Sequence, residues 1–166
     1  LEPYAGKPLL QKYTASIKAN DVIENAIIED IVEARINGKS QKINWMHQSD
    51  GRNHDLSIDS IQRTDKDQQL ILAWDGSKAG ISASGSDTIL IPRRGIFSLM
   101  ETETIQQPDQ YILLRFSDPI DAEQNLKGLI HLDGEDDLIF NVDNNEIRVF
   151  PKERIEGSNV IYIEEG

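Results

Sequence analysis

Short runs in which apolar and polar residues alternate recur along most of the chain. Clusters of Gly, Asn, Asp, Ser and Pro separate the runs, and a period of two residues is typical of half-buried β-strands. The runs in the first half are Tyr13-Ala15-Ile17, Ile43-Trp45, Leu56-Ile58, Leu70-Leu72-Trp74 and Ile89-Ile91. Those in the second half are Phe97-Leu99, Tyr111 to Phe116, Leu129 to Leu132, Leu138-Phe140-Val142, Ile147-Val149 and Val160 to Ile163. The pattern predicts a mainly β chain of the sandwich type rather than alternating βαβ units.

Turn chemistry and composition agree with this prediction. Residues that tolerate a positive φ stand between the runs at Asp50-Gly51, Asp75-Gly76, Asp133-Gly134 and Asp143-Asn144-Asn145. The chain has 23 Ile against 14 Leu and 9 Ala. β-Branched side chains fit a pleated surface, so this balance also favours strands.

One segment, from Asp21 to Arg35, has a different period. Ile23, Ile27, Ile28 and Ile31 recur at spacings of four and three residues. Asp21 and Glu24 have the spacing of a capping box, and Asn37-Gly38 provides a stop signal. These features predict a short helix within residues 22–35.

A faint internal repeat gives a second interpretation of the same segment. Ile17 to Glu24 aligns with Leu114 to Asp121, and Ile28 to Val32 aligns with Leu126 to Ile130. The offset of 97–98 residues matches an immunoglobulin-like sandwich of about 100 residues. Because Gly128 lies in the second copy, the repeat favours a turn followed by a strand at 22–35. The alternative to a repeat is one irregular domain with chance similarity.

The best candidate for a domain boundary is Pro92-Arg93-Arg94-Gly95, where a predicted strand ends on proline. Residues 1–93 carry 11 basic and 13 acidic side chains, whereas residues 94–166 carry 6 and 16. We therefore predict two modules, 1–93 and 94–166, with different electrostatics. At 166 residues the chain is long enough for one medium or two small domains with real cores.

Composition excludes several classes of function. Without cysteine there is no disulfide framework, thiolate nucleophile or iron–sulfur ligand. A net charge of −12 argues against nucleic acid or an anionic membrane surface as partner. No apolar run approaches the roughly 18 residues of a spanning helix, and the start at Leu1 is neither an initiator methionine nor a signal region. We expect the chain to be an excised fragment of a longer protein.

Two clusters have the residue types of metal sites. In the segment from His47 to Asp55, a hairpin would bring His47 and His54 face to face across its turn. No third ligand is visible, so the favoured interpretation is a polar loop between two strands. The segment Asp133-Gly134-Glu135-Asp136-Asp137 has four carboxylates, but Gly134 comes too early for an EF-hand loop. We expect a solvated acidic hairpin there, with calcium binding as the open alternative.

Enzymatic chemistry has no candidate residues. There is no Gly-x-Ser-x-Gly elbow, and the Gly80 to Gly85 segment lacks the Lys-Ser/Thr end of a phosphate loop. The aromatic residues lie mostly within predicted strands, where core packing is the default role and a ligand-binding strip the alternative. We predict no catalytic, cofactor-binding or metal-binding residue, no cofactor and no enzymatic activity.

The stretch from Tyr111 to Asp121 resembles a macroglobulin-type β-sandwich module of the bacterial alpha-2-macroglobulin family. Such modules often have a strand ending in Phe-Ser-x-Pro-hydrophobic-Asp, as Phe116 to Asp121 does here. The later elements of the resemblance are Leu126 to Ile130, the Asn141 to Val149 hairpin, Pro151 and Val160 to Gly166. The first half is similar to the preceding module through Gly38-Lys39-Ser40, Ile43-Asn44-Trp45, Gly51-Arg52 and Ile58 to Arg63.

The resemblance implies an exported endopeptidase inhibitor of the cell envelope, periplasmic or outer-membrane-anchored and often a lipoprotein, which traps proteases when they cleave a bait region. In many members a thioester, which needs a cysteine near Glu-Gln, then captures the protease. This sequence has no cysteine, so no functional residue of the family is carried over to it. We expect a scaffold fragment that touches neighbouring domains of the full-length chain, with a membrane reached only through an anchor outside the fragment. The second macroglobulin-like module, 94–166, is expected to lack its last strand and to expose a sheet edge.

The alternative is a cell-surface adhesion or carbohydrate-binding pair of immunoglobulin-like modules. An aromatic strip lying flat on one sheet face would favour that alternative, whereas buried aromatic rings would favour the scaffold.

Overall fold

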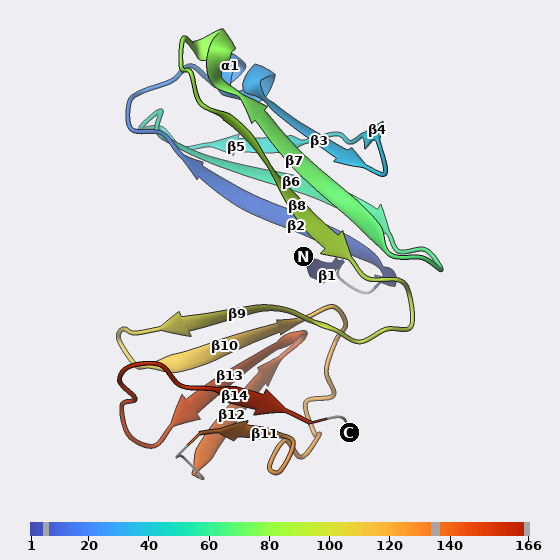
Figure 1. Ribbon diagram of the computed structural model, residues 1–166, viewed down its shortest axis with the longest axis vertical. Coiled ribbons are helices and arrows are strands. Elements are labelled where there is room, and N and C mark those ends of the chain that lie inside the picture. Colours follow the sequence, from blue (N-terminus) through green and yellow to red (C-terminus); the bar gives the residue numbers. More distant parts are fainter. Residues whose placement is uncertain (5–6, 134–136, 165–166) are drawn as a thin grey trace. The chain divides into compact units, whose positions relative to one another are not determined.

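The computed structural model describes residues 1–4, 7–133 and 137–164, and Figure 1 shows their course. The chain divides into two compact units, here called unit 1 and unit 2. Unit 1 consists of Leu1 and Pro3–Ile96, and unit 2 of Glu2 and Phe97–Gly166. Both units are built from antiparallel sheets, so the prediction of a mainly β chain is confirmed.

Unit 1 contains two four-stranded sheets. The first has the order β1 (Glu2–Tyr4), β2 (Lys7–Lys18), β6 (Asn53–Gln62) and β5 (Asn44–His47). The second has the order β4 (Lys39–Ser40), β3 (Val32–Ile36), β7 (Gln68–Asp75) and β8 (Ser84–Ile91). Inward-facing residues of both sheets form one core: Val32, Ala34, Ile36, Leu56, Ile58, Ile61, Leu70, Leu72 and Ile91. Alternation along β6 and β3 places the apolar side chains of each strand on its core face.

The segment 22–35 contains both structures that the sequence suggested, one after the other. Helix α1 (Asn25–Ile31) connects β2 of the first sheet to β3 of the second, and the strand begins at Val32. The predicted capping box is wrong, because Glu24 occupies the N-cap position without a side-chain cap bond and Asp21 lies outside the helix. The helix ends before Arg35 because Val32, Ala34 and Ile36 alternate with exposed residues and pair with β7.

Two of the predicted turns illustrate how glycine and asparagine act here. Asn144 has a φ of 55° and connects β12 (Leu138–Asp143) to β13 (Glu146–Pro151) in a hairpin, as predicted. Asp75-Gly76 is not a tight turn, because Asp75 caps the short 3-10 helix η1 (Gly76–Ala79) by accepting a hydrogen bond from Ser77 N. The predicted turn at Asp133-Gly134 lies partly outside the described residues.

Unit 2 pairs a four-stranded sheet with a two-stranded sheet. The larger has the order β12, β13, β10 (Tyr111–Phe116) and β9 (Leu99–Ile105), and the smaller consists of β11 (Ile130–Leu132) and β14 (Ile161–Ile163). The core residues come from both sheets and the 117–129 segment: Ile112, Leu114, Phe116, Leu126, Ile130, Leu132, Leu138, Ile147 and Val149. This segment has no helix where its proposed repeat in unit 1 has α1. The smaller sheet is two strands narrower than the sheet it faces.

Candidate functional site

The predicted histidine pair is formed across the β5–β6 hairpin. His47 and His54 are directly opposite in the strand register, and their Nδ1 atoms are 2.8 Å apart. His54 is fully buried, while His47 is stacked on Trp45 with 5.6 Å between ring centroids. A contact between two ring nitrogens at this distance needs one hydrogen between them, so one ring donates and the other accepts.

The hairpin turn is held by Asp50, which accepts hydrogen bonds from Arg52 N at 2.9 Å and from Asn53 N at 3.0 Å. The bond from the Arg52 backbone is the largest cause of a lowered pKa for the Asp50 carboxyl, followed by the bonds from Asn53. Gly51 supplies the positive φ of the turn, 63°. The turn thus fixes the register that brings the two histidines together.

A third polar residue, Glu29, joins the pair from helix α1. Its Oε1 lies 3.0 Å from His47 Nε2, on the side of the ring away from His54. Because the two nitrogens of His47 point in different directions, the carboxylate and the two rings do not converge on one point. No group of three or more His, Asp or Glu residues in the described ranges is placed to hold a metal ion. The arrangement is a polar bridge from the helix into the core.

Sequence reasoning had no means of finding Glu29, which is 18 residues from His47 in the chain. The bridge also leaves His54 Nε2 buried without a hydrogen-bond partner among the described residues. A buried unpartnered nitrogen reduces stability.

The acidic segment 133–137 is described only at its two ends. Asp137 Oδ2 accepts from Lys152 Nζ at 3.2 Å, and Asp133 N donates to Val160 O at 3.0 Å. Gly134, Glu135 and Asp136 lie outside the described residues, so the expectation of a solvated hairpin and the calcium alternative both stay predictions.

The described aromatic rings are divided between packing and exposure. Phe116 is buried and stacked on Phe97, with 4.8 Å between ring centroids, and Tyr111 contacts Phe150 at 5.3 Å. The exposed rings are those of Trp74, Phe97 and Tyr162. Trp74 belongs to unit 1 and the other two to unit 2, so these three do not form a strip on one sheet face.

The Phe-Ser-x-Pro motif that carries the family resemblance is a buried junction of strand ends. Ser117 is 1% exposed, and its Oγ accepts from Ser98 N at 2.9 Å and donates to Asp118 Oδ2 at 2.6 Å. Asn145 Nδ2 donates to Phe116 O at 2.8 Å, which ties the end of β10 to the β12–β13 turn. The motif therefore has a structural role.

A second buried polar group, which the sequence did not single out, holds the segment that leaves unit 1. The Arg63 side chain is buried and donates to the carbonyl oxygens of Pro92, Arg93 and Ile96 at 2.8–2.9 Å. The sequence gives one hint of this role: Arg63 lies two residues after the buried Ile61, just past the end of β6, and so falls on the inward-facing side of the strand.

Backbone bonds hold the same segment from its other side. Arg93 N donates to Asp67 Oδ1, and Arg94 N donates to Thr64 O. Side chains and backbone together thus fix residues 92–96 on the β6–β7 end of unit 1.

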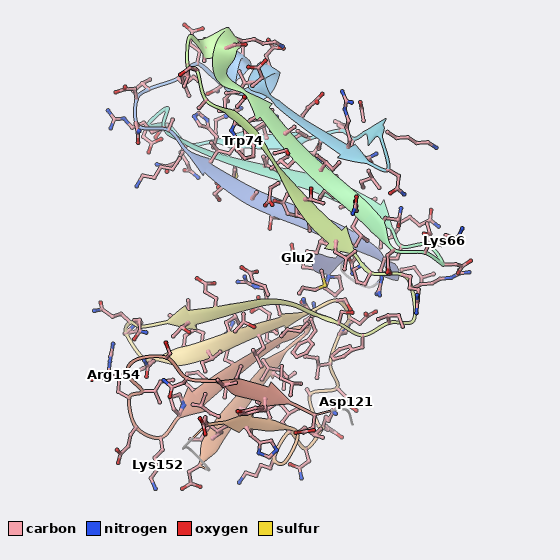
Figure 2. All side chains as sticks on the ribbon, viewed as in Figure 1. Glu2, Lys66, Trp74, Asp121, Lys152 and Arg154 are labelled. Carbon is pink, nitrogen blue, oxygen red and sulfur yellow. The ribbon has the colours of Figure 1, made fainter. Side chains whose placement is uncertain are left out.

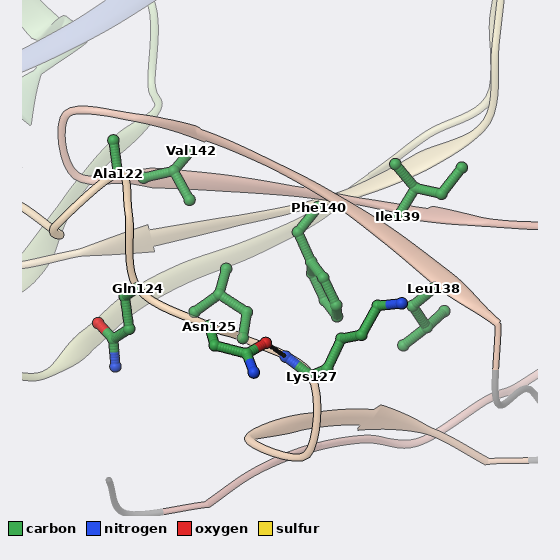
Figure 3. Close-up of a pocket in the computed structure, with 9 residues that line it drawn as sticks. Ala122, Gln124, Asn125, Lys127, Leu138, Ile139, Phe140 and Val142 are labelled. Atoms are coloured by element: carbon green, nitrogen blue, oxygen red, sulfur yellow. Dashed lines mark hydrogen bonds between the residues drawn. The ribbon is translucent and has the colours of Figure 1, made fainter.

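One cavity in unit 2 lies where the 122–127 loop passes the edge strand β12, with a volume of about 410 Å³. In Figure 3 the side chains of Leu138 and Phe140 point from the strand toward Lys127, which lies in the loop. The side chain of Ile139 points to the opposite side of the strand. Asn125 Oδ1 accepts from Lys127 N at 3.1 Å and fixes the loop. Lys127 is the one charged residue of the described lining, so the cavity offers an apolar wall and a single ammonium group.

A second and larger hollow in unit 2 is a groove of about 790 Å³, which we call the unit 2 groove. It is lined by Phe97, Leu99, Phe116, Pro119, Ile120, Asp121, Gln124, Leu126, Leu129, Ile130, Ile147, Ile163 and Glu164. The lining is mainly apolar and includes residues from both sheets. It lies between the edge strand β9 and the short strand β14.

No family model and no curated protein sequence matches this chain. Within the described ranges, no helix has the length and apolar character needed to cross a membrane.

Proposed function

We propose that the chain is a structural part of a macroglobulin-like protease inhibitor and catalyses no reaction itself. In this proposal the full-length protein is exported to the cell envelope and traps proteases, while this part sets the spacing between neighbouring domains. The proposal is supported by the resemblance around Phe116 to Asp121 and by the way in which the chain holds its own connecting segment.

The connecting segment carries the proposal. Ile96 O accepts a hydrogen bond from the buried Arg63 of unit 1, and Ser98 N donates to the buried Ser117 of unit 2. Only Phe97 separates these two anchored residues in the chain. Each unit thus anchors its own end of the connection through a buried side chain, and this supports a spacer role for the chain.

The alternative of a carbohydrate-binding module pair has less support. An extended sugar chain would need several aromatic rings in line on one surface. The exposed rings Trp74 and Phe97 belong to different units, and Phe116 is buried.

Limited trypsin digestion tests the spacer proposal, because Arg93 and Arg94 lie within the anchored segment. A protease binds its substrate in an extended form, which residues 92–96 reach only by releasing their bonds to Arg63, Asp67 and Thr64. We expect slow cleavage after these arginines in the native chain and rapid cleavage in Arg63→Ala, with the fragments identified by mass. Exposed sites such as Lys152 serve as internal controls.

Two results would count against the proposal. Rapid cutting after Arg93 or Arg94 in the native chain would show a loose connection. Dose-dependent inhibition of a protease by the isolated chain would show that it acts directly and is more than a scaffold.

A further inference from the structure

The unit 2 groove combines an apolar floor with an open strand edge. Its walls come from the larger sheet through Leu99, Phe116 and Ile147, and from the smaller sheet through Ile130 and Ile163. Phe97 and Leu99 remain 56% and 43% exposed at its rim. Apolar surface of this kind, between two sheets of unequal width, is surface that a further strand would cover.

The hydrogen-bond pattern shows which backbone groups of β14 are open. Glu164 N donates to Leu129 O and Asp133 N donates to Val160 O, so these residues form the hydrogen-bonded pairs of the antiparallel ladder. Hydrogen-bonded and non-hydrogen-bonded pairs alternate. Ile161 and Ile163, opposite Leu132 and Ile130, are therefore in non-hydrogen-bonded pairs, and their N–H and C=O groups point away from β11.

The two faces of β14 also differ in their surroundings. Ile161 packs against the core of unit 2, and Ile163 lines the groove. Tyr162, which points to the opposite face, is 50% exposed and does not line the groove. A strand added beside β14 would thus have one face over the groove and the other in solvent.

The charge around the groove is negative. Asp121 and Glu164 line it, and the described lining contains no basic residue. Figure 2 shows Lys152 and Arg154 at the end of unit 2 opposite Asp121. Arg115 is bound to Glu146 at 2.7 Å and to Glu101 at 2.6 Å, and the bond with Glu146 is the main cause of its raised pKa.

We propose that the unit 2 groove binds an extended polypeptide strand of a partner protein, which pairs with the open edge of β14. Its apolar side chains alternate toward Phe97, Leu99 and Ile163, and it carries Lys or Arg near Asp121 and Glu164. Backbone hydrogen bonds with Ile161 and Ile163 supply the register, as in other cases of strand addition. A second copy is the wrong occupant, because residues 97–166 carry 16 acidic and 5 basic side chains and repel their like.

The test uses the whole chain and a short capped peptide that alternates Val and Ser and ends in Lys, here called the Val–Lys peptide. The control is a peptide of equal length that ends in Glu instead, here called the Val–Glu peptide. Binding is followed by fluorescence anisotropy, and hydrogen exchange of individual amides is measured by NMR. We expect slower exchange at Ile161 and Ile163 with the Val–Lys peptide, and at least about tenfold weaker binding of the Val–Glu peptide.

Two matched variants separate the groove from the rest of β14. Ile163→Asp places a carboxylate in the groove and should abolish binding, whereas Tyr162→Asp alters the opposite face and should leave it unchanged. Circular dichroism establishes that both variants are folded.

Equal binding of both peptides, unchanged exchange at Ile161 and Ile163, or loss of binding only in Tyr162→Asp would overturn the proposal. So would a concentration-dependent dimer that protects the same two amides. The inference does not rest on the spacer proposal, which is tested at Arg93 and Arg94 of unit 1. Failure of one therefore leaves the result for the other intact.

Discussion

Removal of the Arg63 side chain should selectively destabilise unit 1. The Arg63 guanidinium donates hydrogen bonds to Pro92 O at 2.9 Å and to Arg93 O and Ile96 O at 2.8 Å, among its contacts. Arg63 is 3% exposed and Pro92 is buried, so water does not readily replace the hydrogen bond to Pro92 O. Arg93 and Ile96 are exposed, so water can hydrogen-bond to their carbonyl oxygens once the guanidinium is removed.

The size of the effect follows from this difference. An intramolecular hydrogen bond to a charged group contributes about 1.5–3 kcal/mol, and an unpaired buried acceptor costs about 1–3 kcal/mol. The unpaired Pro92 O should cost about 1–3 kcal/mol, and each of the two exposed carbonyls, where water replaces part of the bond, about 1 kcal/mol. Arg63→Ala should therefore lower the free energy of unfolding of unit 1 by about 3–5 kcal/mol.

The two tryptophans of the chain, Trp45 and Trp74, both belong to unit 1. Tryptophan fluorescence during urea denaturation therefore reports the unfolding of this unit alone. Arg94→Ala is the matched control, since Arg94 is exposed and makes a surface ion pair with Asp65. It should change stability by no more than about 1 kcal/mol.

Equal urea midpoints for Arg63→Ala and Arg94→Ala would contradict this prediction, because buried and exposed arginines would then contribute alike to stability. Arg63→Lys gives a further check. A single ammonium group cannot reproduce the fork of the guanidinium, so its stability should lie between those of Arg63→Ala and the native chain.

Three further substitutions test other parts of the fold. Leu114 is fully buried, so Leu114→Ala should lower the free energy of unfolding of unit 2 by about 2–5 kcal/mol, followed by circular dichroism. The control Ile139→Ala, at an exposed site, should lower it by at most about 0.5 kcal/mol. Similar losses for the two variants would contradict the core assignment. Gly85→Ala would place a Cβ 2.6 Å from Trp74 Cζ2, so the indole ring should move. We expect the tryptophan fluorescence emission to shift to the red, and an unchanged spectrum would count against this contact. Because the pKa of Asp50 is lowered in the folded chain, its carboxylate stabilises the fold at pH values above the unfolded pKa of about 3.9. The native chain should therefore melt at a higher temperature than Asp50→Ala at neutral pH, and this difference should shrink as the pH falls below that value. A difference that stays constant with pH would argue against the turn bonds.

Most strands could be predicted because one face of each is buried and the other is not. Strand β6 shows this most clearly, since Leu56, Ile58 and the turn at Asp50-Gly51 are all visible in the sequence. The choice between helix and strand at 22–35 stayed open because Ile28, Ile31 and Val32 satisfy a helical period up to the point where Val32 starts an alternating run. Two periods that share a boundary residue cannot be separated by spacing alone.

The candidate sites divide in the same way between local and distant signals. The His47–His54 contact could be predicted because a hairpin turn is a local feature. Glu29 and the carbonyl partners of Arg63 could not, since they come from elements that meet only when the two sheets of unit 1 pack together. The unit 2 groove depends on the unequal widths of two sheets, which no single run of residues encodes.

The strong acidity of unit 2 has a physical consequence for the open edge of β14. An exposed apolar strand edge normally leads to pairing between copies of the same chain. Unit 2 carries 16 acidic and 5 basic side chains, so two copies repel at the distances where their edges would begin to pair. The same charge attracts a strand that bears Lys or Arg toward Asp121 and Glu164. Net charge and edge geometry together therefore favour pairing with a different polypeptide segment over self-association.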